Sequence, residues 1–412
     1  MALIVQKYGG TSVGSIERIK EVAEKIAKRV SEGNKLAVVV SAMGKTTDEL
    51  LDMAYKINPT PKKRELDMLL STGEQISISL MAMALQALGL TAYAFTGAQA
   101  GIITNKIHSR ARISKVESKR VKEVLDRGEV AIVAGFQGIT EDEDITTLGR
   151  GGSDISAVAL AASLGADVCE IYTDVEGVFT ADPRIVKDAR LIKRISYEEM
   201  SEMASLGAKV MHPRSIDYAN RYGVTIKVSS SFTWNEGTII TRKEEEELEK
   251  VEVVGVTHDK NVGKVIIKGV PDKPGVAHML FEALAEKEIP IDMIIQSANR
   301  EGINDIAFTV EEGDLKEAIK ITKDVSEKIG AEGVDYEIEI GKISIIGSGI
   351  TKDPHIPSRM FGALAKEGIN IDMISTSGLR ISCLIDERFI EKAVNVLHKE
   401  FKLGEESGEA QS

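Results

Sequence analysis

The chain contains few of the residues that build disulfide-rich or zinc-bound folds. Its 412 residues include only two cysteines, Cys169 and Cys383, each in an apolar run. Two cysteines cannot form a disulfide framework or a four-cysteine zinc site, so we expect both to be buried thiols. The six histidines are scattered along the chain without the spacing of a metal-ligand motif.

The chain also lacks an excess of positive charge and a long apolar run. Lysine and arginine total 52 against 64 aspartates and glutamates, which gives a formal net charge of −12. This balance argues against nucleic-acid and anionic-membrane partners. The N-terminus has no basic leader, and the most apolar helical stretch, Ile76 to Leu90, is broken by Gln86 and too short to span a bilayer. We therefore expect a soluble, cytoplasmic protein.

Short apolar runs alternate with amphipathic helical segments through about the first 240 residues. Runs such as Leu36 to Val40 are continuously apolar, as strands covered on both faces are. Ser15 and Gly33 are typical of the two ends of the helix that precedes this run. The repeated order of strand, glycine turn and helix predicts an α/β fold, with a largely parallel sheet and helices on both faces.

A charge run from Arg242 to Lys250 marks the predicted domain boundary. Beyond it the sequence repeats: a segment that begins at Val262 returns about 80 residues later, at Ile340. Each copy contains a strand, a Pro/Gly loop, a helix, two further strands and a second helix, which predicts two paired α+β domains. The predicted domains are residues 1–245, 262–339 and 340–412.

No standard nucleotide-binding motif is complete. Gly44-Lys45-Thr46 is similar to the end of a P-loop, but Val39 occupies the position of the required first glycine. Gly149 and Gly151 could begin the G-x-G-x-x-G fingerprint of a dinucleotide-binding fold, but Asp154 occupies the position of its third glycine. A Rossmann dehydrogenase is therefore poorly supported.

Four other segments carry residues suited to phosphate and carboxylate chemistry. They contain Lys7 in KYGGTS, Arg150 and Asp154 in TLGRGGSD, Asp174 at a strand end, and Glu74 in STGE. Glycine turns present backbone amides to an anion, and a following helix adds its positive end. Arg150 can bind a carboxylate or phosphate with two parallel hydrogen bonds. Capping or dipole compensation could also explain Asp154 and Glu74, since both lie in a first helical turn.

Six segments together resemble the aspartate kinase family. In chain order they are KYGGTSV, VVVSAMGKTTDEL, LLSTGEQIS, TTLGRGGSD, EIYTDVEGVFTADPR and GAKVMHPRS, and the duplicated region follows them. The resemblance covers nearly the whole chain. It implies the amino acid kinase fold followed by two ferredoxin-like ACT domains, in a monofunctional enzyme without a homoserine dehydrogenase segment.

The resemblance also implies a reaction and its site residues. The implied reaction transfers the γ-phosphate of ATP to the side-chain carboxylate of L-aspartate, giving 4-phospho-L-aspartate and ADP, as the first step toward lysine, threonine and methionine. The implied catalytic residues are Lys7, Asp154, Arg150 and Glu74. The implied nucleotide contacts are Lys7, Tyr8, Gly9, Gly10, Ser12, Thr173, Asp174, Phe179, Arg184 and Lys209. The implied aspartate contacts are Ser41, Thr47, Glu74, Arg150, Gly151, Gly152 and Ser153.

Two further features follow from the resemblance. Mg²⁺ would be held mainly through ATP, near Asp154, without a protein-only metal site. Phe179 stands where many members carry tyrosine, so the aromatic ring is kept and its hydroxyl is lost.

The duplicated region is implied to bind lysine, acting with threonine, as feedback effectors. Pro357 stands where some members that respond to both amino acids carry a polar residue, which leaves the threonine part open. The implied effector contacts are Asp272, Gly275, Val276, Ala277, Asp292, Gln296, Ile356, Asn370, Ile371 and Ser377. ACT pairing implies an oligomer, either a homodimer or a tetramer with a separately made regulatory small subunit.

Two alternative functions remain open at this point. An acetylglutamate or glutamate kinase would share the fold and the glycine turns, but an N-acetylated substrate has no ammonium for Glu74 to bind. A catalytically silent amino-acid sensor is the other alternative. Lys7, Arg150, Asp154 and Lys209 are all retained, so nothing in the sequence indicates lost catalysis.

Overall fold

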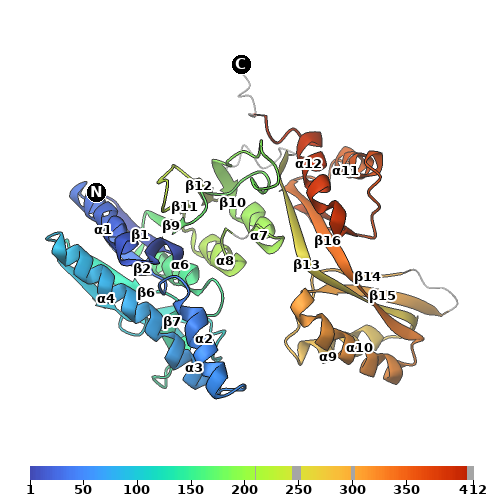
Figure 1. The fold of residues 1–412 in the computed structure, drawn as a ribbon, viewed down its shortest axis with the longest axis horizontal. Coiled ribbons are helices and arrows are strands. Elements are labelled where there is room, and N and C mark those ends of the chain that lie inside the picture. Colours follow the sequence, from blue (N-terminus) through green and yellow to red (C-terminus); the bar gives the residue numbers. More distant parts are fainter. Residues whose placement is uncertain (209, 244–251, 298–301, 406–412) are drawn as a thin grey trace. The chain divides into compact units, whose positions relative to one another are not determined.

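The computed structural model describes residues 1–208, 210–243, 252–297 and 302–405 (Figure 1). These residues form two compact units. The N-terminal unit contains residues 1–179 and 191–243, and the C-terminal unit contains 180–190 and 252–405. Lys209 and most of the predicted linker, residues 244–251, lie outside the described residues.

An eight-stranded sheet forms the centre of the N-terminal unit, in the order β10-β12-β11-β9-β1-β2-β6-β3. The six strands from β11 to β3 run parallel, and β12 is antiparallel to β11. The strands are β1 (Leu3–Tyr8), β2 (Lys35–Val40), β3 (Ala92–Phe95), β6 (Val130–Ala134), β9 (Val168–Thr173), β10 (Arg194–Ser196), β11 (Ile226–Ser230) and β12 (Thr238–Thr241). The predicted, largely parallel sheet is confirmed.

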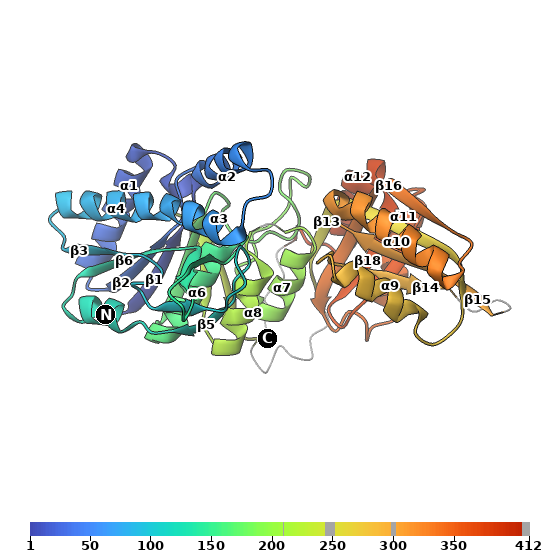
Figure 2. The ribbon, with the colours of Figure 1, turned by 90° about the horizontal axis from the view of Figure 1, so that it is seen from below.

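Helices cover both faces of this sheet, as predicted (Figure 2). Helices α1 and α4 share a hydrophobic core with one face, where residues such as Ile26 and Met81 pack on Val38. Helix α6 lies on the other face, because it carries Asp154, which pairs with Lys7 of β1. The helices are η1 (Thr11–Val13), α1 (Ile16–Ser31), α2 (Thr46–Ile57), α3 (Lys63–Leu70), α4 (Thr72–Ala87), α5 (Lys119–Asp126), α6 (Gly152–Leu164), α7 (Tyr197–Ser205) and α8 (Pro213–Tyr222).

The predicted ends of α1 are found where Ser15 and Gly33 indicated them. The Ser15 hydroxyl accepts a hydrogen bond from the Arg18 amide at 3.3 Å, and Gly33 has a positive φ of 86° just after the helix. A smaller sheet adds four strands in the order β5-β4-β7-β8. These strands are β4 (Ile102–Thr104), β5 (Ile113–Val116), β7 (Gln137–Ile139) and β8 (Ile145–Thr147).

One helical stretch, Lys63–Ala87, is apolar and long enough to cross a membrane by length and composition alone. Half of its most apolar window is buried inside the fold, as in the core helix of a soluble protein. Both cysteines are free and buried, which confirms the prediction of buried thiols.

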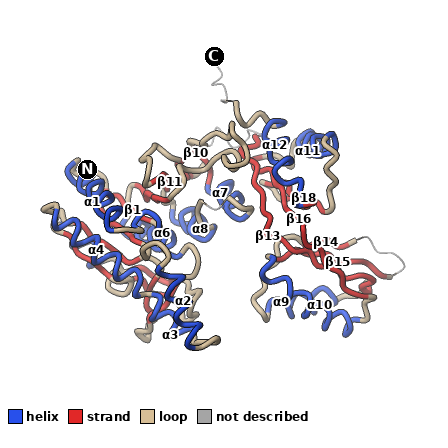
Figure 3. Tube along the Cα trace, viewed as in Figure 1, coloured by secondary structure: helices blue, strands red, loops and turns tan. Residues whose placement is uncertain are grey.

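The C-terminal unit is a six-stranded antiparallel sheet with helices packed on it, in the order β14-β15-β13-β16-β18-β17 (Figure 3). Two long strands, β13 and β16, pair with each other through both sequence copies. The strands are β13 (Glu252–Pro271), β14 (Ile294–Gln296), β15 (Ile303–Val310), β16 (Gly333–Ser348), β17 (Met373–Thr376) and β18 (Arg380–Asp386). The helices are α9 (Val276–Ala285), η3 (Glu312–Asp314), α10 (Leu315–Ile329), α11 (His355–Lys366), η4 (Glu387–Phe389) and α12 (Ile390–Glu400).

The two copies are joined by reciprocal ion pairs. Lys264 of the first copy contacts Asp372 of the second at 2.5 Å, and its equivalent Lys342 pairs with Asp292 of the first copy. Both lysines are buried, with 5% and 4% of their surface exposed. A small shared core that contains Met293 and its equivalent Met373 packs nearby in the same arrangement.

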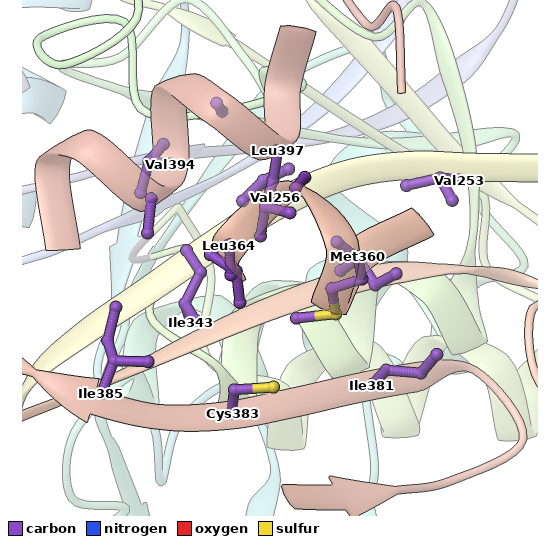
Figure 4. Close-up of a cluster of buried hydrophobic side chains, with 14 of the residues drawn as sticks. Val253, Val256, Ile343, Met360, Leu364, Ile381, Cys383, Ile385, Val394 and Leu397 are labelled. Atoms are coloured by element: carbon purple, nitrogen blue, oxygen red, sulfur yellow. The ribbon is translucent and has the colours of Figure 1, made fainter. Parts of the chain in front are cut away.

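Residues 180–190, here called the arm, leave the N-terminal part of the sequence and pack into the C-terminal unit. Ala181 and Val186 enter the hydrophobic core that contains Leu397 and Met360 (Figure 4). The Thr180 hydroxyl lies 2.9 Å from Nε2 of the buried His398. Sequence periodicity did not indicate this exchange, since the arm contains no helix or strand.

Candidate active site

The carboxyl ends of five parallel strands form one continuous rim in the N-terminal unit. The amide of Gly9, after β1, donates to the Tyr172 carbonyl of β9 at 3.2 Å. On the other side, the Ser41 amide donates to the Tyr8 carbonyl at 3.1 Å, and the Gly135 amide to the Val40 carbonyl at 3.0 Å. In α/β sheets ligands bind at this end of the strands. The rim therefore brings the predicted glycine turns together.

A buried ion pair lies at the centre of the rim. Nζ of Lys7, at the end of β1, lies 2.7 Å from Oδ1 of Asp154, in the first turn of α6. Each side chain is 11% exposed. Two opposite charges held at the mouth of a glycine turn can bind a phosphate and, through the carboxylate, a hard cation.

Backbone amides at two helix starts are left without an intrahelical partner. At η1, Ser12 donates to the Gly9 carbonyl, which leaves the amides of Gly10 and Thr11 without a hydrogen bond among the described residues. At α6, the left-handed Gly151 (φ 70°) precedes the helix, and the Ser153 amide is likewise unbonded there. Such amides, with the positive end of the helix dipole, form an anion site.

Glu74 is a buried carboxylate with an unsatisfied oxygen. It lies in the first turn of α4, is 2% exposed, and accepts one hydrogen bond from the Ala42 amide at 3.2 Å through Oε1. Its Oε2 has no hydrogen-bond partner among the residues that the structure describes. Burial raises the pKa of Glu74 to about 8. A buried carboxylate in this state is suited to receive a cationic group from a ligand.

The other predicted substrate residues differ in their exposure. Arg150 is exposed and makes no ion pair with any described residue, so its guanidinium is available to a ligand anion. Ser41 and Thr47 are half-buried, at the end of β2 and in the first turn of α2. Gly152 packs so closely on Phe136 that an added Cβ would lie 2.8 Å from the ring.

The predicted nucleotide contacts are distributed more widely. Thr173 and the exposed Asp174 end β9 on the rim, with the Thr173 hydroxyl donating to Asp174 at 3.1 Å. The Ser12 hydroxyl accepts from Ser231 at 2.8 Å and is fully buried. The side chain of Tyr8 does not reach the rim, because it is buried in the α1–α4 core and stacks on Tyr172 with centroids 4.9 Å apart.

Three other residues that were predicted to contact the nucleotide are Phe179, Arg184 and Lys209. Phe179 is half-buried and pairs with Leu191 in an isolated bridge. Arg184 belongs to the arm, in the C-terminal unit, and forms a bidentate ion pair with Asp182. Lys209 lies outside the described residues. All three assignments therefore stay predictions.

Residues 2–230 match the amino acid kinase family, and residues 265–324 and 343–401 match the ACT domain. An aspartokinase of Mycolicibacterium smegmatis is 50% identical over 98% of this chain and 97% of its own length.

The chain belongs to the aspartokinase family.

Solved aspartokinases share the fold. Escherichia coli aspartokinase III in complex with aspartate and ADP has a TM-score of 0.80 at 24% identity, over 97% of this chain and 99% of that one. The same enzyme in complex with lysine and aspartate has a TM-score of 0.77, again at 24% identity, over 97% and 99% of the two chains. At this identity the likeness shows the fold, an amino acid kinase fold followed by ACT domains. This aspartokinase is a phosphotransferase with an amino acid kinase domain.

One buried network in this aspartokinase was missed by the sequence analysis. Asp67 of α3 is fully buried and accepts hydrogen bonds from the Thr147 hydroxyl at 2.6 Å and the Ser109 amide at 2.9 Å. Nδ1 of His108 lies 2.9 Å from the same carboxylate. The network fixes Thr147 just before the glycine turn of Arg150. A charged residue between the apolar Leu66 and Leu70 was the available signal.

The described residues of this aspartokinase contain no group of three or more His, Cys, Asp or Glu side chains that could hold a metal ion. The donors that are present suit Mg²⁺ held chiefly by phosphates, since Asp154 offers a single hard carboxylate oxygen beside the anion-binding amides.

The predicted effector residues all lie in the C-terminal unit, in different environments. In the first copy, Gly275 is the left-handed residue before α9, and Asp292 is engaged by Lys342. In the second copy, Ile356 is buried in the hydrophobic core, whereas Asn370 is exposed. The remaining residues, Asp272, Val276, Ala277, Gln296, Ile371 and Ser377, lie in loops or at the ends of α9 and β14.

Proposed function

We propose that this aspartokinase transfers the γ-phosphoryl group of ATP to the side-chain carboxylate of L-aspartate, giving 4-phospho-L-aspartate and ADP. The observation that carries the proposal is the unsatisfied, buried oxygen of Glu74 on the same rim as the Lys7–Asp154 pair. One feature suits the ammonium of an amino acid and the other suits a phosphoryl group. The complex of E. coli aspartokinase III with aspartate and ADP supports the same pairing of ligands.

The reaction needs no general base. A side-chain carboxylate with a reference pKa of about 3.9 is already ionised at neutral pH. A carboxylate oxygen of aspartate attacks the γ-phosphorus, the bond to the oxygen that bridges the β- and γ-phosphorus breaks, and the electron pair leaves with ADP. The barrier is repulsion between two anions, so neutralisation and positioning supply the catalysis.

The rim residues divide these tasks. Lys7 and the amides at the starts of η1 and α6 neutralise the charge of the phosphoryl oxygens. Arg150 forms a bidentate ion pair with the α-carboxylate of aspartate. Glu74 accepts the α-ammonium, and Ser41, Thr47 and the α6 turn (Gly151, Gly152, Ser153) line the same pocket. Thr173, Asp174, Phe179, Arg184 and Lys209 contact the nucleotide. Mg²⁺, when bound with ATP, would be held by Asp154 and would supply further neutralisation of phosphate charge.

We also propose that lysine, acting with threonine, inhibits this enzyme by binding the ACT domains. The proposed domains are residues 1–245, 262–339 and 340–412, and the ACT domains pair in a homodimer or in a tetramer with a small subunit. The complex of E. coli aspartokinase III with lysine and aspartate supports a lysine effector. Inhibition of this kind suits a cytoplasmic enzyme at the first step of lysine, threonine and methionine synthesis.

A coupled ADP-release assay with aspartate, glutamate and N-acetylglutamate tests the activity. Only aspartate is expected to support rapid turnover, because the acetylated substrate cannot pair with Glu74. Lys7→Ala should lower turnover by about 100-fold or more, as removal of one charge-stabilising donor typically does. Activity with N-acetylglutamate alone would contradict the proposal and identify an acetylglutamate kinase. No activity with any of the three substrates would favour a catalytically silent sensor.

A further inference from the structure

A second cavity lies on the opposite face of the main sheet from Lys7. It has a volume of about 290 Å³ and is bounded by α1, by strands β1, β9 and β11, and by the loop between β11 and β12. Gln6 and Tyr8 line it, and these residues alternate along β1 with Lys7, which points to α6. The cavity is therefore separate from the rim that binds the substrates.

The floor of the cavity is polar where a parallel sheet is normally apolar. The sheet register places Gln6, Glu170 and Lys227 side by side on β1, β9 and β11. Gln6 and Glu170 are 1% and 3% exposed. Glu170 accepts hydrogen bonds from Gln6 at 2.8 Å and from Tyr172 at 3.0 Å, and it binds Arg29 of α1 at 2.6 Å.

This network holds the Arg29 guanidinium against the cavity floor. Its Nε is buried and finds no hydrogen-bond acceptor in the described part of the chain. A buried polar group without a partner is rare in native structures and indicates a role or a missing ligand.

Trp234 forms one wall in a strained conformation. Its φ of 55° is in the left-handed region, which a bulky residue adopts rarely. Two hydrogen bonds hold the loop. The Trp234 amide donates to the Ser230 carbonyl at 3.1 Å, and the Asn235 side-chain amide donates to the Glu176 carbonyl at 2.8 Å. Nζ of Lys25 lies 5.0 Å from the centre of the Trp234 ring.

The lining carries an excess of positive charge on an acidic chain. Lys25, Lys28, Arg29 and Lys227 face the cavity against only two carboxylates, those of Glu32 and Glu170. Lys28 and Lys227 have no ion-pair partner among the described residues. Arg29 pairs with both of these carboxylates, Glu170 at 2.6 Å and Glu32 at 3.6 Å, so the charge of the remaining lysines favours an added anion.

We propose that this cavity binds a small organic dianion, a phosphorylated or dicarboxylic acid of a few carbons. Its volume lies at the lower end of the roughly 300–1,000 Å³ typical of ligand pockets, so it suits such an acid better than a nucleotide. The dianion would bridge Lys28 and Lys227 across the floor, beside the Arg29 guanidinium. Trp234 and Lys25 would close the site.

The site contains its own reporter, because Trp234 is the single tryptophan of the chain. The full-length protein is titrated with inorganic phosphate and, separately, with succinate, while tryptophan fluorescence is recorded. Isothermal calorimetry of the same titrations counts the bound anions. A saturable fluorescence change is expected in at least one arm. Phosphate alone would indicate phosphorylated ligands, succinate alone would indicate dicarboxylic ligands, and both would indicate dianions generally.

The variant pair Lys28→Gln with Lys227→Gln should weaken the response by about tenfold or more, which is about 1.4 kcal/mol of binding free energy. The matched pair Lys20→Gln with Lys122→Gln removes the same charge from exposed sites elsewhere and should leave the response intact. Turnover with aspartate should stay unchanged in all of them, and thermal unfolding confirms that each variant folds.

Lys7→Ala separates this site from the substrate rim, and the fluorescence response should survive that change. The proposal is overturned if the response disappears in Lys7→Ala, or if the two lysine pairs weaken it equally. Absence of both a fluorescence change and a calorimetric site in the two titrations would overturn it as well, and would leave the lysines as the solvated face of an amphipathic helix.

Discussion

At the scale of single residues, Glu74 has the clearest chemical requirement. Its environment withholds both water and a second hydrogen-bond donor, so the site is completed only when a ligand provides a cation. A carboxylate in this state lowers the folding stability of the free protein, and it makes binding selective for ligands that carry a cationic group. This trade-off is common where binding sites are built in advance.

Glu74 predicts a pH dependence of aspartate binding. With a pKa of about 8, its carboxyl is largely protonated in the free site at neutral pH. The ammonium of aspartate needs the ionised form, so KM for aspartate should fall as pH rises from about 6.5 to about 8. Glu74→Gln should raise KM and flatten this dependence. Steady-state kinetics across this range test it, and a parallel pH slope in the variant would assign the titration to another group.

The same shift affects stability, with a definite sign. The folded pKa of about 8 exceeds the ordinary value of 4.5, so the folded protein binds this proton more tightly than the unfolded chain. The contribution of Glu74 to the free energy of unfolding is therefore lost as pH rises from about 4.5 to about 8. Chemical denaturation of the wild type and Glu74→Gln at both ends of this window should show a smaller pH effect in the variant.

Arg150 predicts a different pattern, because its side chain is exposed and unpaired. Arg150→Ala should raise KM for aspartate roughly tenfold to a hundredfold, which corresponds to charge-assisted hydrogen bonds worth about 1.5–3 kcal/mol. Arg150→Lys should restore only part of this, since a point charge lacks the planar fork. KM for ATP should change little. A larger rise in KM for ATP than in KM for aspartate would mean that Arg150 contacts the nucleotide and not the amino acid.

At the scale of elements, the glycine turns hold adjacent strand ends together. The Gly44 amide, in the turn after β2, donates to the Gly10 carbonyl, in the turn after β1, at 3.0 Å. An added Cβ at Gly10 would lie 2.8 Å from the Ala42 carbonyl oxygen. Because Ala42 also donates to Glu74, this close approach couples the phosphate turn to the amino-acid pocket.

Gly10→Ala should therefore impair both sides of the rim. Turnover should fall by at least tenfold, about 1.4 kcal/mol, and KM for aspartate should rise. Gly14→Ala is a matched control, because its Cβ would lie 3.4 Å from its nearest neighbours and its φ is −68°. Kinetics and thermal unfolding of both variants test this. Equal losses in the two would mean that general destabilisation, and not the contact with Ala42, is responsible.

Most elements could be predicted because their signals are local. A continuous apolar run predicted β2, and Ser15 and Gly33 predicted the two ends of α1. Local signals failed where the partner is distant in sequence. The Asp67 network depends on residues about 40 and 80 positions away, and the side chain of Tyr8 enters the core because of its strand parity. The chemistry of the rim was visible in the motifs, but its unsatisfied oxygen was not.

At the scale of the molecule, the cross-paired copies provide an internal control for regulation. Asp292 and Asp372 are equivalent residues, and each pairs with a buried lysine of the other copy. Removing Asp292 takes this carboxylate from the buried Lys342, whereas Lys264 keeps an ion pair with Glu337 at 3.2 Å when Asp372 is removed. A comparison of the two variants therefore needs their unfolding temperatures beside their response to lysine.

We expect Asp292→Ala to relieve inhibition by lysine while uninhibited turnover stays nearly intact. Asp372→Ala should keep the lysine response and lower the unfolding temperature by less, because Lys264 retains its ion pair with Glu337. Titration of lysine and threonine, singly and together, against activity tests both variants. An identical loss of inhibition in both would mean that Asp292 acts through the interface of the copies and not as an effector contact.

The arm has a practical consequence for protein engineering. Residues 180–190 contribute Ala181 and Val186 to the core of the C-terminal unit, although they are encoded between two segments of the kinase half. A chimera that joins this kinase half to a foreign regulatory half at residues 244–251 would pair a native arm with a core it did not evolve to fill. The boundary for such grafts is therefore discontinuous, and residues 180–190 must be exchanged together with the regulatory half.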